Sequence, residues 1–349
     1  MEFLPEAAGP HDPILVTAAR PGGSVRRTTN IDTARPDGLR ADADVEVDGR
    51  ARDVRTNPDG TTEVVGEAWL KATVSPAQKL LSITTSPDVP ALQHLVGASV
   101  GSGFRSHVNA VVTDACADGS LLYLLLDDLP GATLVSGYAL HRAGLLDDPP
   151  IDAGGDASPK RPPRDLGRLG DLCAGWAQDA TMMVRLLETG SIPVPIGPVA
   201  PVLEREGDPL SWHAMAPLPP HSVRRRRLLD LVAPNAPDGM HRIDLHFRDS
   251  HTDGDGNETI MHEYTVRGTA DARSGRIASV VTEARVLPWL ECPGALASAE
   301  RIVGMELSSL RPIIRKEFVG RSTCTHLNDS LRSLADVTAL ARELEPPPS

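Results

Sequence analysis

The chain has 349 residues, a formal net charge of −12 and 40% hydrophobic residues, a fraction that excludes a disordered protein and supports folded cores. The acidic balance argues against nucleic acid as a partner, because phosphate binding needs a basic field. No apolar run could span a bilayer and the start, MEFLPEAAGPHDP, is unlike a signal peptide, so we expect a cytoplasmic protein without a membrane partner.

The first half of the sequence changes from a strand pattern to a helix pattern. Residues 1–23 are expected to form a disordered arm. Residues 24–86 alternate as strands do, and Asp48-Gly49 predicts a hairpin turn. The segments 90–112 and 119–129 then have helical periodicity. We therefore interpret residues 24–140 as one α+β unit.

Residues 141–221 are rich in proline and glycine and indicate a linker, with one helix predicted at 171–190. Directly after it stands the basic run RRRR, residues 224–227. Because an apolar stretch follows, we interpret this run as a solvated strand edge.

Residues 222–345 repeat the order of the first half. Strands are expected on either side of the turns DGDGN and DARSG, and helices over 294–320 and 327–344. Gly97 of the first half can be laid opposite Gly304 of the second. The predicted fold class is α+β, with two copies of an antiparallel sheet plus helices joined by the linker.

The candidate metal ligands gather in the second copy. Cys292 ends a strand pattern before a helix, and Cys324 and His326 begin another helix, where a thiolate has a lowered pKa. The strand residue His262 could complete a tetrahedral site for zinc or iron. The first copy mostly lacks this set, and at the matching places it has Asp88, Asp114, Cys116 and Glu67.

The motifs IMHEYTV, ECP, RIVGMEL and TCTHLNDSLRSLADV resemble a bacterial family known only as a domain of unknown function. The CTHL element is the most specific of them. The resemblance covers the second copy best, and it implies a grouping without an activity.

A more distant resemblance is to the fold of the iron–sulfur cluster scaffold proteins, carried by the order of strands, Cys292, a small-residue helix, a glycine and the final helix. It implies that Cys292 matches a ligand cysteine and that Cys324 and His326 match an adjacent His-Cys pair. Here the order of that pair is reversed and a threonine intervenes. The first ligand cysteine has no counterpart, and His262 or His251 lies nearest. These departures are compatible with a mononuclear metal site.

Several functions remain open at this point. A metal at Cys292, Cys324, His326 and His262 could serve an enzyme that acts on a small organic substrate between the copies. Alternatives are a non-catalytic binding or accessory module, a cysteine nucleophile with a histidine base, and cysteines that only pack. The acidic loop with Asp249 and His251 is interpreted as a solvated turn.

Overall fold

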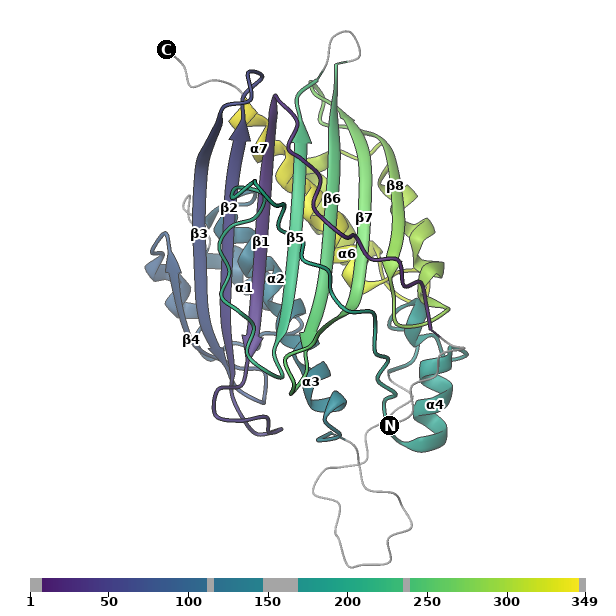
Figure 1. Ribbon diagram of the computed structural model, residues 1–349. Coiled ribbons are helices and arrows are strands. Elements are labelled where there is room, and N and C mark those ends of the chain that lie inside the picture. Colours follow the sequence, from purple (N-terminus) through teal and green to yellow (C-terminus); the bar gives the residue numbers. More distant parts are fainter. Residues whose placement is uncertain (1–7, 112–115, 147–168, 235–238, 345–349) are drawn as a thin grey trace, which may run out of the picture.

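The computed structural model describes residues 8–111, 116–146, 169–234 and 239–344. Its centre is one antiparallel sheet of eight strands in the order β4-β3-β2-β1-β5-β6-β7-β8 (Figure 1). The strands are β1 (Ser24–Ala34), β2 (Val45–Thr56), β3 (Thr62–Val74), β4 (Leu80–Ser86), β5 (Val223–Val232), β6 (Met240–Thr252), β7 (Glu258–Asp271) and β8 (Ile277–Val286). The expectation of an α+β fold with antiparallel strands is confirmed.

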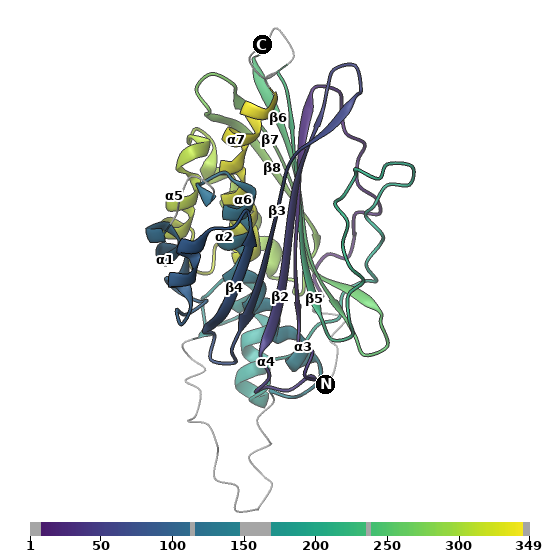
Figure 2. The same ribbon diagram turned by 90° about the vertical axis from the view of Figure 1, so that its left-hand side faces the viewer.

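The helices that follow each set of four strands pack on the same face of the sheet (Figure 2). The α-helices are α1 (Phe104–Val111), α2 (Leu121–Val135), α3 (Gly137–Arg142), α4 (Thr181–Thr189), α5 (Leu310–Glu317), α6 (Thr325–Ser333) and α7 (Val337–Leu344). The 3-10 helices include η2 (Pro90–Leu95), η5 (Ala174–Trp176), η6 (Cys292–Ile302), η7 (Leu307–Ser309) and η8 (Leu334–Asp336). The segments 8–23 and 192–221 run along the other face.

The two sets of strands join at the middle of the sheet, where β1 pairs with β5 over ten residue positions, Ser24 opposite Val232 to Thr33 opposite Val223. From this junction each set runs outward in chain order. One buried apolar cluster lies under the helices on the β5–β8 side and another on the β1–β4 side.

Two details of the sequence interpretation were wrong. Asp48 and Gly49 lie inside β2 and form no turn; a Cβ on Gly49 would lie 3.4 Å from Leu125 of α2, so a glycine here allows close helix packing. The helical segments 90–112 and 294–320 are each interrupted, because Gly97 and Gly304 adopt φ angles of +87° and +83°. The turns predicted at DGDGN and DARSG are present.

The basic run is also not a solvated edge. Arg224, Arg225, Arg226 and Arg227 lie in β5, next to the centre of the sheet, and their exposed fractions are 8% or less. Because side chains alternate along a strand, two of these arginines project to each face. Each has a carboxylate partner: Asp32, Asp249, Glu204 and Asp128 in turn.

In the described part of the chain, none of the helices combines the length and the apolar character needed to cross a membrane. The linker prediction falls partly on residues 147–168, and Asp114 falls on 112–115; both lie outside the described residues.

Candidate metal centre

A row of polar side chains crosses β5, β6 and β7 on the helix-covered face. Arg225 is the cross-strand partner of Asp249, and Asp249 is the partner of His262. Arg225 donates two hydrogen bonds to the Asp249 carboxylate, each 2.9 Å long. Asp249 has no exposed surface. The row therefore fixes a carboxylate beside an imidazole inside the protein.

The pairing of Asp249 with His262 depends on an irregularity in the β6–β7 hairpin. Thr252, His251 and Ser250 pair with Glu258, Thr259 and Ile260, and the register then shifts by one residue. Without this bulge Asp249 would lie opposite Met261. Bulges of this kind re-aim side chains and are common beside functional sites.

Helix α6 brings a second histidine over the row. The rings of His262 and His326 are stacked, with centroids 3.6 Å apart and an angle of 15° between their planes. The Nε2 atom of His326 lies 3.5 Å from Oδ2 of Asp249. One potential ligand atom from each of Asp249, His262 and His326 lies within 4.8 Å of the other two.

Both histidines are neutral at physiological pH. Burial, with the charge of Arg225, lowers the pKa of His326 to about 3. Burial and the neighbouring His326 lower the pKa of His262 well below its ordinary value. The buried Nδ1 atom of His262 has no hydrogen-bond partner among the described residues. A neutral imidazole with a free lone pair is the form that binds a metal.

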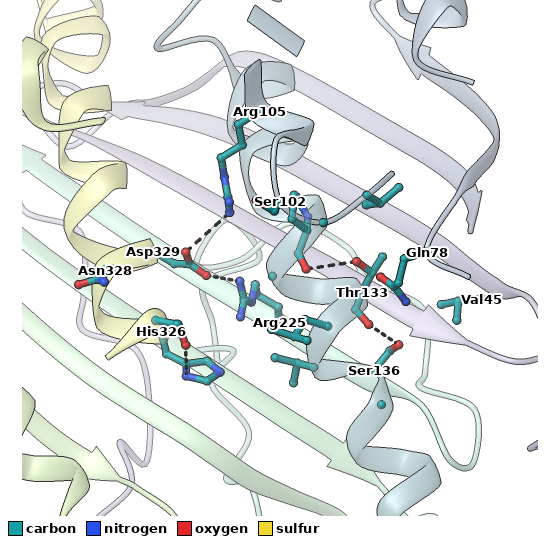
Figure 3. A pocket seen from close by; sticks show the side chains of 18 of the residues that line it. Val45, Gln78, Ser102, Arg105, Thr133, Ser136, Arg225, His326, Asn328 and Asp329 are labelled. Carbon is teal, nitrogen blue, oxygen red and sulfur yellow. Dashed lines mark hydrogen bonds and ion pairs between the residues drawn. The ribbon is translucent and has the colours of Figure 1, made fainter. Parts of the chain in front are cut away.

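A network of arginines and aspartates continues from this row to α6. Arg225 is shared between Asp249 and Asp329, the latter at 2.7 Å on α6 (Figure 3). Burial opposes ionisation of Asp329, but Arg332, Arg225 and Arg105 outweigh it and hold the pKa of Asp329 below its ordinary value. Each Asp249 oxygen has a second lone pair, so the contact with Arg225 does not exclude a cation.

Two imidazoles and one carboxylate form a donor set used for zinc and for non-haem iron(II), with positions left open for water or substrate. Ligands about 2.1 Å from a metal are about 3.4 Å apart in a tetrahedral site. The ligand atoms, which lie within 4.8 Å of one another, would therefore have to close by up to about 1.4 Å, and the stacked rings would have to turn toward one ion.

The structure brings two of the sequence-predicted ligands, His262 and His326, into one cluster. Cys324 lies at its border: its Sγ atom is 3.7 Å from Nδ1 of His326 and 3.3 Å from the Tyr264 hydroxyl. Cys292 is buried at the start of η6, and a Cβ placed on Gly175 would lie 2.7 Å from its Sγ atom. Among the described residues, the cluster of potential ligands contains neither cysteine.

The expectation of a lowered cysteine pKa at a helix start was wrong. Cys324 does occupy the N-cap position of α6. Burial nevertheless raises the pKa of its thiol, and the Tyr264 hydroxyl and the first amides of α6 only partly oppose this effect. Burial also raises the pKa of Cys292 well above its ordinary value. These thiols are poor candidates for an activated nucleophile.

Asp249 is the potential ligand that the sequence interpretation missed. It was placed in a solvated turn, whereas it lies in β6, three residues before the strand ends at Thr252. The short distance from the turn DGDGN could have placed it near His262, but the bulge that aligns the two is not visible in the sequence. His251, the other histidine considered, packs against the Tyr138 ring instead.

The other half of the sheet carries a related row without the histidine. Arg27 pairs with Asp53 across β1 and β2 through hydrogen bonds of 2.9 and 2.7 Å. Asp53 pairs in turn with Gly66 on β3, again beside a register shift. A Cβ on Gly66 would lie 3.2 Å from Leu121 of α2. Helix packing thus occupies the place that the two histidines occupy in the second half.

A cavity of about 830 Å³ adjoins the centre, between α1 and α2 on one side and α5 and α6 on the other (Figure 3). His326, Asp329 and Arg225 lie on its wall. Its volume is typical of a site for a small organic molecule. His326 thus belongs to both the cluster and the cavity.

Part of the chain matches a family of known sequences. Residues 223–340, about a third of the chain, match a family model described as "Protein of unknown function (DUF2889)". The matched segment contains Asp249, His262, Cys292, Cys324 and His326, and excludes β1 to β4. No curated protein and no solved structure matches the chain. This part of the chain is therefore similar to a family whose description names no function.

Proposed function

We propose that this protein binds one divalent transition metal ion, zinc or iron(II), through Asp249, His262 and His326. The observation that carries the proposal is the convergence of two neutral imidazoles on a buried carboxylate, with the His262 Nδ1 atom left without a partner among the described residues. Buried polar atoms are nearly always satisfied, and a metal ion would satisfy this one.

This ligand set replaces the two cysteines expected from the sequence with Asp249. Cys324 would then support the centre from outside, since its thiol lies near the His326 nitrogen that points away from Asp249. Partners of the non-ligating nitrogen orient a metal-bound imidazole.

The proposed activity is metal-dependent chemistry on a small organic molecule held in the adjoining cavity. A metal with three protein ligands keeps a position for water or for a substrate oxygen, and it would activate the one or polarise the other. Because His326 lies on the cavity wall, that position would be within reach of a bound molecule. The alternative is a non-catalytic binding or accessory module, which would hold the metal without turnover.

We also propose that the two halves arose by duplication and that only the second kept the centre. The support is the pair of rows Arg27–Asp53–Gly66 and Arg225–Asp249–His262, which occupy corresponding strands and both lie beside a bulge. A reciprocal pair of bridges, Arg26–Asp230 and Arg224–Asp32, links β1 to β5.

Elemental mass spectrometry of the full-length protein tests the metal proposal. We expect about one zinc or iron per folded chain, and loss of that metal in His262→Ala and His326→Ala. Cys292→Ala is the matched control, because it alters the ligand set expected from the sequence and leaves the cluster intact. Metal that survives in His262→Ala but disappears in Cys292→Ala would overturn the assignment.

A further inference from the structure

The cavity beside the metal centre carries an unusual excess of positive charge. Five arginines and one aspartate line it: Arg35, Arg105, Arg225, Arg315, Arg332 and Asp329. The whole chain has a net charge of −12, so this local balance is opposite to that of the molecule. A cleft with low-dielectric walls concentrates such a field and attracts anions.

Three of these arginines already have carboxylate partners. Arg225 is shared by Asp249 and Asp329. Arg332 pairs with Asp329 at 2.6 Å and with Asp127 at 3.1 Å. Arg105 lies 3.0 Å from Asp127 and points toward Asp329 (Figure 3). These three arginines line the cavity, but their positive charges are already largely neutralised by the aspartates.

Of the other two arginines, Arg35 has no carboxylate partner among the described residues, whereas Arg315 lies in the field of Asp118 and Asp127. Arg35 donates from Nη1 and Nη2 to the carbonyl and hydroxyl of Ser136, at 3.1 and 3.4 Å, and its buried Nε atom has no partner in the described part of the chain. Arg315 donates from Nε to the carbonyl of Arg311 at 3.2 Å. A partly buried guanidinium without a counter-ion is costly, and a bound anion would remove that cost.

Two helix starts add to the positive potential. Ser102 and Gly103, which precede α1, and Thr325 and His326, which begin α6, all line the cavity. The N-terminal end of a helix carries partial positive charge. The rest of the lining includes apolar side chains of both halves: Val45, Val100, Leu134, Ile314 and Phe318.

We propose that the cavity binds an amphipathic organic anion, a carboxylate with an apolar body, and that Arg35 neutralises its acid group. This inference names the substrate class of the site and rests on the proposed function for its catalytic meaning. The volume exceeds what an inorganic anion needs, and the apolar wall would bury a hydrocarbon or aromatic body.

Displacement of a fluorescent anilinonaphthalene sulfonate from the full-length protein tests the proposal. Octanoate and octanol are the competing probes, because they share a chain and differ in charge. We expect octanoate to bind at least about tenfold more tightly than octanol. Equal binding of the two, or no binding of octanoate, would overturn the assignment.

Substitutions test which arginine binds the acid group of octanoate. Arg35→Met should weaken octanoate binding about fivefold or more and leave octanol binding unchanged, while Arg35→Lys should restore most of the preference. Arg321→Met is the control, since Arg321 is 59% exposed and pairs with Asp179 outside the cavity. Circular dichroism shows whether each variant is folded. Unchanged octanoate binding in Arg35→Met would contradict the role of Arg35.

Metal content and octanoate binding, both measured on the parent protein, separate this proposal from the metal proposal. If the parent protein prefers octanoate but contains no metal, only the metal proposal is contradicted. If it contains metal but shows no preference for octanoate over octanol, only the anion proposal is contradicted.

Discussion

His262 of β7 and His326 of α6 stack ring on ring, 3.6 Å apart, above the buried carboxylate of Asp249. Contact between two imidazoles is tolerable only while both are neutral, and burial keeps them so. Helix α6 therefore contributes two side chains to this site: the imidazole of His326 and, through Asp329, a second carboxylate for Arg225.

The helix α2 glycine Gly131 should be intolerant of substitution. A Cβ at this position would collide with Arg225 Nη1 and lie 2.8 Å from Oδ2 of Asp329. Both atoms belong to a buried ion pair that cannot move freely. We expect Gly131→Ala to lower the free energy of unfolding by about 2 to 4 kcal/mol.

Gly137→Ala is the matched control for that experiment. Gly137 begins α3, and nothing lies within 4 Å of a Cβ placed there. Alanine in a helix gains up to about 1 kcal/mol over glycine, so urea unfolding should show an unchanged or slightly more stable protein. Equal effects of the two substitutions would mean that the Arg225–Asp329 pair does not restrict this site.

The buried pair Arg227–Asp128 should be costly to break. The side chains are 1% and 3% exposed. We expect Asp128→Ala to destabilise the fold by about 3 to 5 kcal/mol, because it leaves Arg227 buried and without its principal partner. Glu306→Ala, which breaks the exposed pair with Arg276, should change the urea midpoint little. A small effect of Asp128→Ala would show that water reaches Arg227.

His213 should make stability depend on pH. Its Nδ1 atom lies 2.9 Å from the Thr28 hydroxyl and its Nε2 atom 2.6 Å from Oδ1 of Asn30, which suits a neutral ring that accepts at one nitrogen and donates at the other. Burial, with nearby arginines, lowers the pKa of His213 to about 3.

Between the ordinary histidine pKa and this lowered value, the unfolded chain binds a proton that the folded protein does not. Stability therefore falls as pH falls, by about 2 kcal/mol between pH 6.5 and 5 from this residue. In the parent protein the urea midpoint should be lower at pH 5 than at pH 6.5. His213→Gln should remove the contribution of His213, so the difference between the two midpoints should be smaller in the variant. An identical pH slope in the variant would contradict a neutral, buried His213.

The native cysteines should react slowly with a thiol reagent. Cys116, Cys292 and Cys324 are buried, and burial raises the pKa of the half-buried Cys173 to about 12. At pH 8 we expect little labelling in the native protein and four reactive thiols in guanidinium chloride. Fast labelling of one native thiol would instead support the cysteine nucleophile.

The sequence by itself determined the class of elements and most of their places. Alternating residues predicted strands in both halves, and Asp-Gly-rich turns marked the ends of β6 and β7. It also pointed to His262 and His326, because histidines in a strand and at a helix start are visible as local features.

Only the tertiary structure decided how these features meet. The bulge in β6–β7 aligns Asp249 with His262, and the β1–β5 junction turns the arginine run into buried partners for distant carboxylates. The cysteines stood out as the metal ligands in the sequence, but burial against apolar neighbours raises the pKa of their thiols. Local pattern fixes which way a side chain alternates, whereas register and long-range pairing fix what it faces, and those depend on segments far apart in the chain.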